Sequence, residues 1–206
     1  MNNRDRVERA WQAPAVVALA SALLAGCGAK AVREQAPAKP PAEATPSPSR
    51  GRAAGEGRSV ALLPVDRAGY DAAITKLHGK VVLVDFWATW CLPCVEQLPH
   101  TLELGERFAD RGLAVVTVSC DEPEEADRVN KFLNAKQAGG ATNLISQFGG
   151  SPRTMDEFEI TSGAVPFYKL YDRTGKLRQT FGIRPTSKKQ FTPAEIEAAA
   201  EQLLAE

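Results

Sequence analysis

One stretch decides the fold: Val81-Val-Leu-Val-Asp-Phe-Trp-Ala-Thr-Trp-Cys-Leu-Pro-Cys94. Residues 81–86 have the length and valine content of a central parallel strand, and residues 95–111 have apolar side chains at helical spacing. Cys91 is therefore predicted at the N-terminus of a helix. The first N–H groups of a helix lack backbone partners and carry partial positive charge, so a sulfur placed there favours the thiolate form.

The two cysteines that end this stretch have the spacing of a redox pair. Their sulfurs are close enough to form a disulfide, so Cys91 can attack a partner disulfide and Cys94 can resolve the mixed disulfide. Structural zinc is the alternative, but it needs two further ligands with suitable spacing. The remaining cysteines and histidines form no such pair, and no metal is predicted; they are Cys27, His78, His100 and Cys120.

The motif at residues 84–94, Val-Asp-Phe-Trp-Ala-x-Trp-Cys-x-Pro-Cys, resembles the active-site signature of the thioredoxin superfamily. The flanking residues, Gly79-Lys80 before the motif and Pro99 after it, resemble those of the membrane-tethered TlpA/ResA-type thiol-disulfide oxidoreductases within that superfamily. The resemblance extends from about residue 59 to the C-terminus. It implies an α/β fold, namely a thioredoxin-like three-layer sandwich with a central mixed sheet, and dithiol/disulfide exchange with protein partners without a cofactor.

Asp85 is out of place in the middle of an apolar strand. Burying an unpaired carboxylate is costly and raises its pKa, which makes the group a usable proton acceptor. The resemblance places Asp85 beneath Cys94, whose proton it takes. The alternative is a carboxyl group satisfied by backbone donors at a strand end.

Val165-Pro166 resembles the cis-proline step that faces the disulfide in this superfamily. A cis bond there would present the backbone of Val165 to an extended substrate segment. An ordinary trans-proline that opens a strand is the alternative. Trp90 is expected on the surface where partners dock, and Pro93 fixes the loop without an N–H that would compete at the sulfur.

One position departs from the pattern of the relatives, which often carry a glutamate three residues after the second cysteine. Gln97 stands there, and Glu96 lies one residue earlier, where a helix points it in another direction. Without a glutamate at position 97, Asp85 is expected to carry more of the proton transfer, or the reduction potential of the cysteine pair differs. Cys120 ends a buried strand, and we expect it to act only as a small apolar side chain.

Residues 1–27 have the pattern of an export signal, with basic residues followed by an apolar run too short to span a bilayer. The run ends in Leu24-Ala-Gly-Cys27, which resembles a bacterial lipobox, so Cys27 is predicted to carry lipid. A chance cysteine in an uncleaved anchor is the alternative. Residues 28–58 are rich in alanine and proline and are predicted to form a disordered tether, which leaves residues 59–206 as one domain.

The charge distribution argues against nucleic-acid binding. Residues 59–206 hold 16 Lys+Arg and 20 Asp+Glu without a basic cluster. The signal segment and the lipobox predict an extracytoplasmic, membrane-anchored lipoprotein, and a monomer is expected. The resemblance to TlpA/ResA-type proteins implies that it reduces exported protein disulfides, for instance in cytochrome c maturation, while the sequence alone leaves the direction of electron flow open. Its electrons would come from a membrane thiol donor.

Two other functions stay open at this point. A thiol peroxidase on the same fold would want a peroxidatic cysteine in a Thr-x-x-Cys context. A copper-carrying module would want methionines or histidines near the thiols, and Met1 and Met155 are the two methionines of the chain.

The rest of the domain is predicted from hydrophobic spacing and turn residues. Strands are expected at residues 60–64, 113–118, 143–148, 167–171 and 176–182, and helices at 66–77, 121–134, 152–158 and 192–204.

Overall fold

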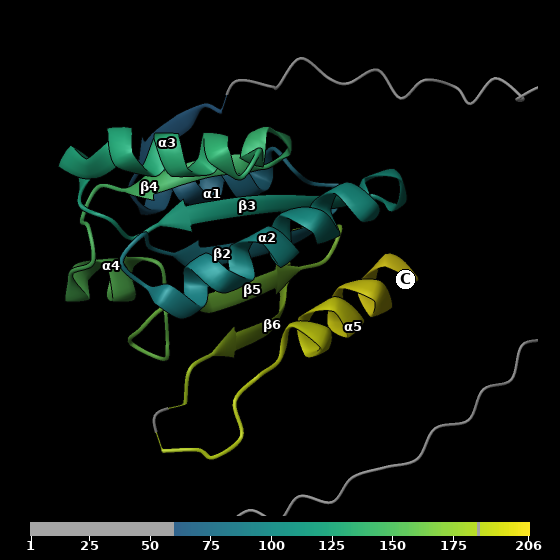
Figure 1. Cartoon of the computed structure of the whole chain (residues 1–206). Helices are drawn as coiled ribbons and strands as arrows, with labels where there is room; N and C mark the ends of the chain where they lie inside the picture. The colour runs from purple at the N-terminus through teal and green to yellow at the C-terminus, as the bar shows by residue number, and fades with distance from the viewer. Residues whose placement is uncertain (1–59, 185) are drawn as a thin grey trace, which may run out of the picture. The chain divides into compact units, whose positions relative to one another are not determined.

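The computed structural model describes residues 60–184 and 186–206 (Figure 1). The predicted export segment 1–27 with Cys27, and the tether 28–58, lie outside the described residues. Within the described part of the chain, no helix is both long and apolar enough to cross a membrane. The strands are β1 (Leu62–Val65), β2 (Val81–Trp87), β3 (Leu113–Ser119), β4 (Thr142–Ser146), β5 (Phe167–Tyr171) and β6 (Leu177–Gly182). The α-helices are α1 (Arg67–Thr75), α2 (Leu92–Arg107), α3 (Ala126–Ala135), α4 (Pro152–Glu157) and α5 (Pro193–Leu204).

The strands form one six-stranded sheet in the order β1-β4-β3-β2-β5-β6. The first four strands of this order run parallel to one another, β5 pairs antiparallel with β2, and β6 pairs antiparallel with β5 at the edge of the sheet. Every residue of β2 is buried, as its valine-rich sequence predicts for a central strand. Asp85 in this strand lies opposite Thr117 of β3 on one side and Tyr168 of β5 on the other.

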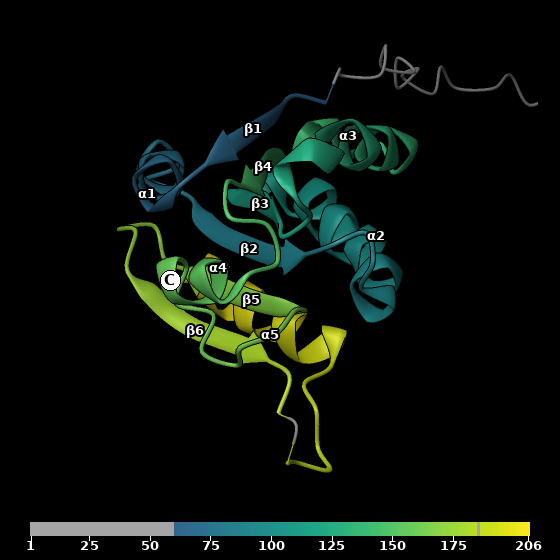
Figure 2. The same cartoon turned by 90° about the vertical axis from the view of Figure 1, so that its left-hand side faces the viewer.

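Helices cover both faces of the sheet, and alternate residues of β2 point to opposite faces. Val82, Val84 and Phe86 pack in the core that contains Tyr70 and Ile74 of α1. Val81 and Leu83 pack in a second core with side chains of α2 and α5. Figure 2 shows α1 and α4 on one side of the sheet and α2 on the other. The predicted thioredoxin-like sandwich with a central mixed sheet is therefore confirmed.

Local signals in the sequence set the ends of several helices. The side chain of Asp66 caps α1 by accepting from the backbone N–H of Gly69. Thr192 and Glu195 form the predicted capping box at the start of α5. Cys91 is the N-cap residue of α2, and Pro93 lies in its first turn, where a missing N–H costs no helical hydrogen bond.

Several element boundaries differ from the prediction by a few residues, for instance β4, which ends at Ser146, and two of the differences have a local explanation. Pro64 was expected to end the first strand, but β1 continues to Val65 because β1 is an edge strand, where proline is tolerated. The predicted helix at residues 121–134 starts later: a short 3-10 turn, Pro123–Glu125, precedes α3.

Candidate active site at the N-terminus of helix α2

Cys91 and Cys94 are joined by a disulfide across the first turn of α2, with their Cα atoms 5.3 Å apart. The loop that carries Cys91 follows directly from the buried end of β2. Cys94, one turn into the helix, shares the buried face of α2 with Leu98 and Thr101. The helix thus places one sulfur at its N-terminus and the other against the core, in the order that the sequence predicts.

Cys91 itself is nearly covered in this oxidised state. The sequence predicts an exposed helix end, but Cys91 is only 6% exposed, while its neighbours Trp90 and Leu92 are 55% and 68% exposed. The segment before β5 contributes to this cover, because Cys91 Sγ lies 3.7 Å from the carbonyl oxygen of Val165. A partner would therefore meet an apolar rim around a partly shielded sulfur.

The Val165–Pro166 peptide bond is cis, as expected from the sequence. Both residues precede β5, the antiparallel neighbour of β2, so the fold brings this segment to the end of β2 from which the disulfide loop leaves. The carbonyl oxygen of Val165 lies beside the oxidised sulfur of Cys91, which has no hydrogen to donate. The predicted catalytic role of Pro166 and the predicted substrate-binding roles of Trp90, Pro93 and Val165 stay predictions.

The two tryptophans near the disulfide differ in their surroundings. Trp90 is an exposed aromatic side chain beside Cys91, and its ring borders Gly150 in the turn after β4. Trp87 is fully buried and packs on Phe132 of α3, with ring centroids 5.2 Å apart. Trp90 is thus placed to touch a partner, and Trp87 belongs to the core.

Asp85 is completely buried on the face of β2 that α2 covers. Thr101 Oγ1 donates a hydrogen bond to Asp85 Oδ2 at 2.8 Å, and Oδ1 has no hydrogen-bond partner among the described residues. Burial raises the pKa of Asp85 to about 7, against the lowering effects of the Thr101 and Tyr168 hydroxyls. The donor is a side chain and not the backbone at a strand end, and the carboxyl group can hold or release a proton near neutral pH.

Tyr168 and Gln97 are two further polar side chains of this site, and they are hydrogen-bonded to each other. The hydroxyl of Tyr168 donates to Gln97 Oε1 at 3.2 Å. Burial raises the pKa of Tyr168, and the nearby charge of Asp85 raises it further, so the phenol keeps its proton. The sequence singles out Gln97 but not Tyr168 or Thr101. Thr101 could have been found from its spacing of seven residues after Cys94, which places both on one helix face.

A second buried carboxylate supports the loop before the disulfide and was missed from the sequence. Asp121 accepts hydrogen bonds from the backbone N–H of Thr89, at 2.9 Å, and from the hydroxyl of Ser119, at 2.6 Å. Arg128 of α3 lies 3.7 Å from the same carboxylate. Asp121 could have been found from the sequence, because it follows β3 and the carboxyl ends of the adjacent parallel strands β2 and β3 lie at the same edge of the sheet.

Cys120 is a buried free thiol, and burial raises its pKa to about 12. Its backbone N–H donates to the carbonyl oxygen of Trp87 at 2.7 Å, which fixes the end of β3 against the end of β2. A thiol this weakly acidic forms little thiolate at neutral pH. Within residues 60–184 and 186–206, no three His, Cys, Asp or Glu side chains are grouped to hold a metal ion.

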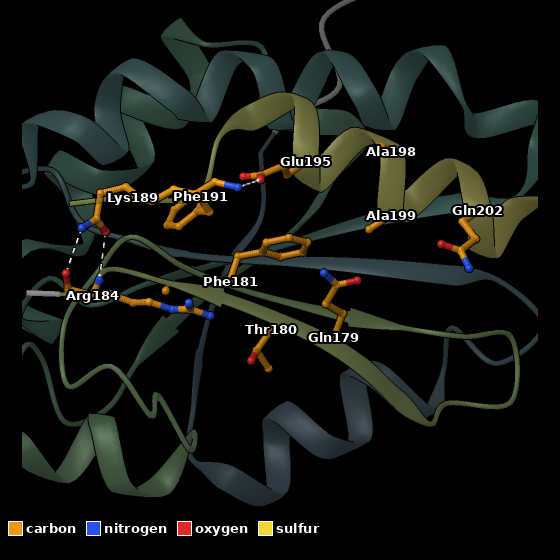
Figure 3. A pocket seen from close by; sticks show the side chains of 12 residues that line it. Gln179, Thr180, Phe181, Arg184, Lys189, Phe191, Glu195, Ala198, Ala199 and Gln202 are labelled. Atoms are coloured by element: carbon orange, nitrogen blue, oxygen red, sulfur yellow. Dashed lines mark hydrogen bonds and ion pairs between the residues drawn. The ribbon is translucent and has the colours of Figure 1, made fainter. Parts of the chain in front are cut away.

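A hollow of about 440 Å³ lies elsewhere, between β6 and α5 (Figure 3). Phe181 and Phe191 lie between the strand and the helix, and Lys189 pairs with Glu195 at 3.4 Å. None of the predicted site residues lines it. Phe191 in its lining packs its ring edge-on against Tyr168, with centroids 5.6 Å apart, and Phe181 pairs with Tyr168 across β5 and β6.

Comparison with known proteins gives matches over the described domain. The model of the AhpC/TSA family matches residues 60–201. Thiol-disulfide oxidoreductase ResA of Oceanobacillus iheyensis is 26% identical over 118 residues, which cover 57% of this chain and 46% of that protein. ResA of Geobacillus kaustophilus is 26% identical over 114 residues, covering 55% of this chain and 61% of that protein. The chain thus spans about half the length of these curated relatives.

Among solved structures, a thiol:disulfide interchange protein of the thioredoxin family from Chlorobium tepidum is similar to this chain. It is 20% identical, with a TM-score of 0.47, and the match covers 63% of this chain and 83% of that one.

Proposed function

Because the chain belongs to the AhpC/TSA family, we propose that it is a thiol-disulfide oxidoreductase that exchanges its Cys91–Cys94 pair with protein thiols and disulfides. The observation that carries this proposal is the disulfide across the first turn of α2, at the end of a buried strand. Helix N-termini stabilise a thiolate, and a vicinal second cysteine allows the exchange to finish within the protein. The names of the two curated relatives support the same chemistry.

In the reducing direction, the Cys91 thiolate of the dithiol form attacks one sulfur of a substrate disulfide. A bond forms between Cys91 and that sulfur, and the other substrate sulfur leaves as a thiolate. Asp85 accepts the proton of the Cys94 thiol, and the Cys94 thiolate then attacks Cys91 Sγ. The intramolecular disulfide forms, the second substrate sulfur leaves, and the proton held by Asp85 passes to a released thiolate. Two electrons have moved from the protein to the substrate.

The surroundings of Cys91 suit an extended polypeptide substrate. The carbonyl oxygen of Val165, 3.7 Å from Cys91 Sγ, can accept a backbone N–H of a segment lying beside the sulfur. Trp90 offers exposed aromatic surface next to the same atom. On this basis we assign substrate binding to Trp90 and Val165, together with Pro93 beside Cys94, and we assign Pro166, whose cis bond presents Val165, to the catalytic residues.

We further propose that the protein works outside the cytoplasm as a lipoprotein anchored through Cys27. The support is the sequence Leu24-Ala-Gly-Cys27 after a short apolar run, followed by the alanine- and proline-rich tether 28–58. In this setting its substrates are exported cysteine-containing proteins such as apocytochromes, and its electrons come from a membrane thiol donor.

Trapping in the native host tests the exchange chemistry. The full chain with Cys94→Ser should leave a mixed disulfide between Cys91 and a host protein, released by a reductant. The matched control is Cys91→Ser/Cys94→Ser, which keeps Cys120 and should trap nothing. Reduction of insulin by the purified wild type provides the direct assay. Failure of both trapping and insulin reduction would overturn the proposal, and peroxide consumption without a disulfide substrate would favour a thiol peroxidase instead.

A further inference from the structure

Two hydroxyl groups, those of Thr101 and Tyr168, lie near the buried carboxyl group of Asp85, and Gln97 bonds the second of them. Thr101 donates to Oδ2 at 2.8 Å, and Tyr168 lies directly opposite Asp85 in the pairing of β2 with β5. Tyr168 donates to Gln97 Oε1 at 3.2 Å, and Oδ1 of Asp85 has no partner among the described residues. One oxygen of the carboxyl group is thus fixed, and the other has a hydroxyl nearby that is bonded elsewhere.

We propose that Tyr168 and Gln97 form a hydrogen-bond pair that reverses its direction with the protonation state of Asp85, a positioning role that rests on the proposed exchange chemistry. Neither residue takes up the proton. They supply the buried carboxyl group with an acceptor when it is protonated and with a donor when it is ionised.

The observed arrangement suits the protonated carboxyl group. A proton on Oδ1 needs an acceptor, and the Tyr168 oxygen can accept it while its own O–H donates to Gln97 Oε1. The chain of donors then runs from Asp85 through Tyr168 to Gln97. A proton on Oδ1 would thus give this oxygen, which has no partner among the described residues, the hydrogen bond that buried polar groups require.

The ionised carboxyl group needs the opposite direction. Oδ1 then lacks a donor, and rotation of the Tyr168 hydroxyl supplies one through a charge-assisted hydrogen bond. The Tyr168 oxygen can accept an N–H from Gln97 once the side-chain amide turns over, because an amide carries both a donor and an acceptor. A proton that leaves Cys94 for Asp85, or returns, therefore meets a paired carboxyl group in either state.

This role explains why an amide can serve at position 97. A glutamate there would accept from Tyr168 but could not donate to it, and its negative charge would lie near Asp85. It would hold the pair in the direction that suits the protonated form. Gln97 is half-buried and neutral, so it can bond in both directions at no electrostatic cost.

Few other titratable groups face Asp85. Among the described residues they are Tyr168 from β5 and Cys120 after the end of β3, and the proposed exchange adds the thiol of Cys94 from α2 once the disulfide is reduced. The phenol of Tyr168 keeps its proton over the range in which Asp85 titrates, because burial and the charge of Asp85 both raise its pKa. The ring is held by Phe191 at 5.6 Å, so the hydroxyl proton can turn while the ring stays in place.

Titration of the Asp85 carboxyl group in the oxidised full chain tests the pair. Its infrared or carbon-13 NMR signal is assigned by its loss in Asp85→Asn. Tyr168→Phe removes a donor to the ionised form and should move the Asp85 titration up by about one pH unit. Tyr70→Phe is the matched control, because Tyr70 bonds Tyr171 on the opposite face of the sheet, and it should leave the titration unchanged.

A second substitution separates the hydrogen-bond pair from simple charge repulsion. Gln97→Glu should also raise the Asp85 titration, and most of this shift should disappear when Tyr168→Phe is present, since the effect passes through the hydroxyl. Equal shifts in both backgrounds, or a Tyr168→Phe titration identical to wild type, would overturn the proposal. Oxidised protein needs no exchange activity, so the shifts are measured whether or not insulin is reduced, and the two proposals fail separately.

Discussion

Replacing Asp85 by asparagine should stabilise the oxidised protein at alkaline pH. Asparagine keeps the size of the side chain and an oxygen that accepts from Thr101, which bonds Asp85 at 2.8 Å, but it carries no charge. Burial raises the pKa of Asp85 to about 7 in the folded state, whereas an unfolded aspartate ionises near 3.9. Ionising Asp85 in the folded protein therefore costs free energy once the pH exceeds its folded pKa.

The size and sign follow from proton linkage. Between about pH 4 and 7 the folded protein binds a proton that the unfolded chain has already released, so stability falls as pH rises through this window. A difference of about three pKa units corresponds to ~4 kcal/mol at full ionisation, at 1.36 kcal/mol per unit. Asp85→Asn should be more stable than wild type by up to that amount at pH 8, and the difference should vanish near pH 4.

Urea unfolding of both oxidised proteins at pH 4, 6 and 8 provides the measurement. Glu96→Gln, an exposed substitution on the first turns of α2, is the matched control and should follow the wild-type curve. If Asp85→Asn is no more stable than wild type at pH 8, or if its advantage does not depend on pH, then Asp85 is not a buried group with a raised pKa.

Further substitutions test the support around the site. Asp121→Ala removes the acceptor of the Thr89 N–H and the Ser119 hydroxyl, leaving buried donors unpaired, and should lower the free energy of unfolding by about 2–4 kcal/mol in urea titrations. Leu98→Ala on the buried face of α2 should cost about 2–5 kcal/mol by the same measurement. Cys120→Ala should cost only about 1 kcal/mol and leave the rate of insulin reduction unchanged; a large loss of rate would give Cys120 a role in exchange.

The central strand, the helix that follows it and the placement of the cysteine pair could all be predicted from the sequence. Their signals are local: a valine-rich run, helical spacing, and two cysteines at the junction. The insertion of β4 between β1 and β3 could not be predicted, because strand order depends on pairing between segments far apart in the chain. An edge strand could be expected at residues 60–64, but its continuation through Pro64 to Val65 depends on the pairing of β1 with β4.

The polar groups of the site show the same contrast between local signals and contacts of distant segments. Asp85 stands out in the sequence because a carboxyl group interrupts an apolar strand. Its partner Tyr168 looks like any other aromatic residue of a strand until the antiparallel register places it opposite Asp85. The sequence identified Gln97 as a departure from the relatives, but its contact with Tyr168 required the packing of α2 against β5.

The reactivity of Cys91 in the reduced protein tests the account most directly. Cys91 is the N-cap of α2, where the first N–H groups of a helix lack backbone partners and favour a thiolate, and Cys94 lies one turn further along the helix. At pH 7, iodoacetamide should modify Cys91 much faster than an ordinary exposed thiol, and mild oxidation should return the Cys91–Cys94 disulfide. Labelling no faster than free cysteine, or oxidation that leaves the two residues unjoined, would contradict the account.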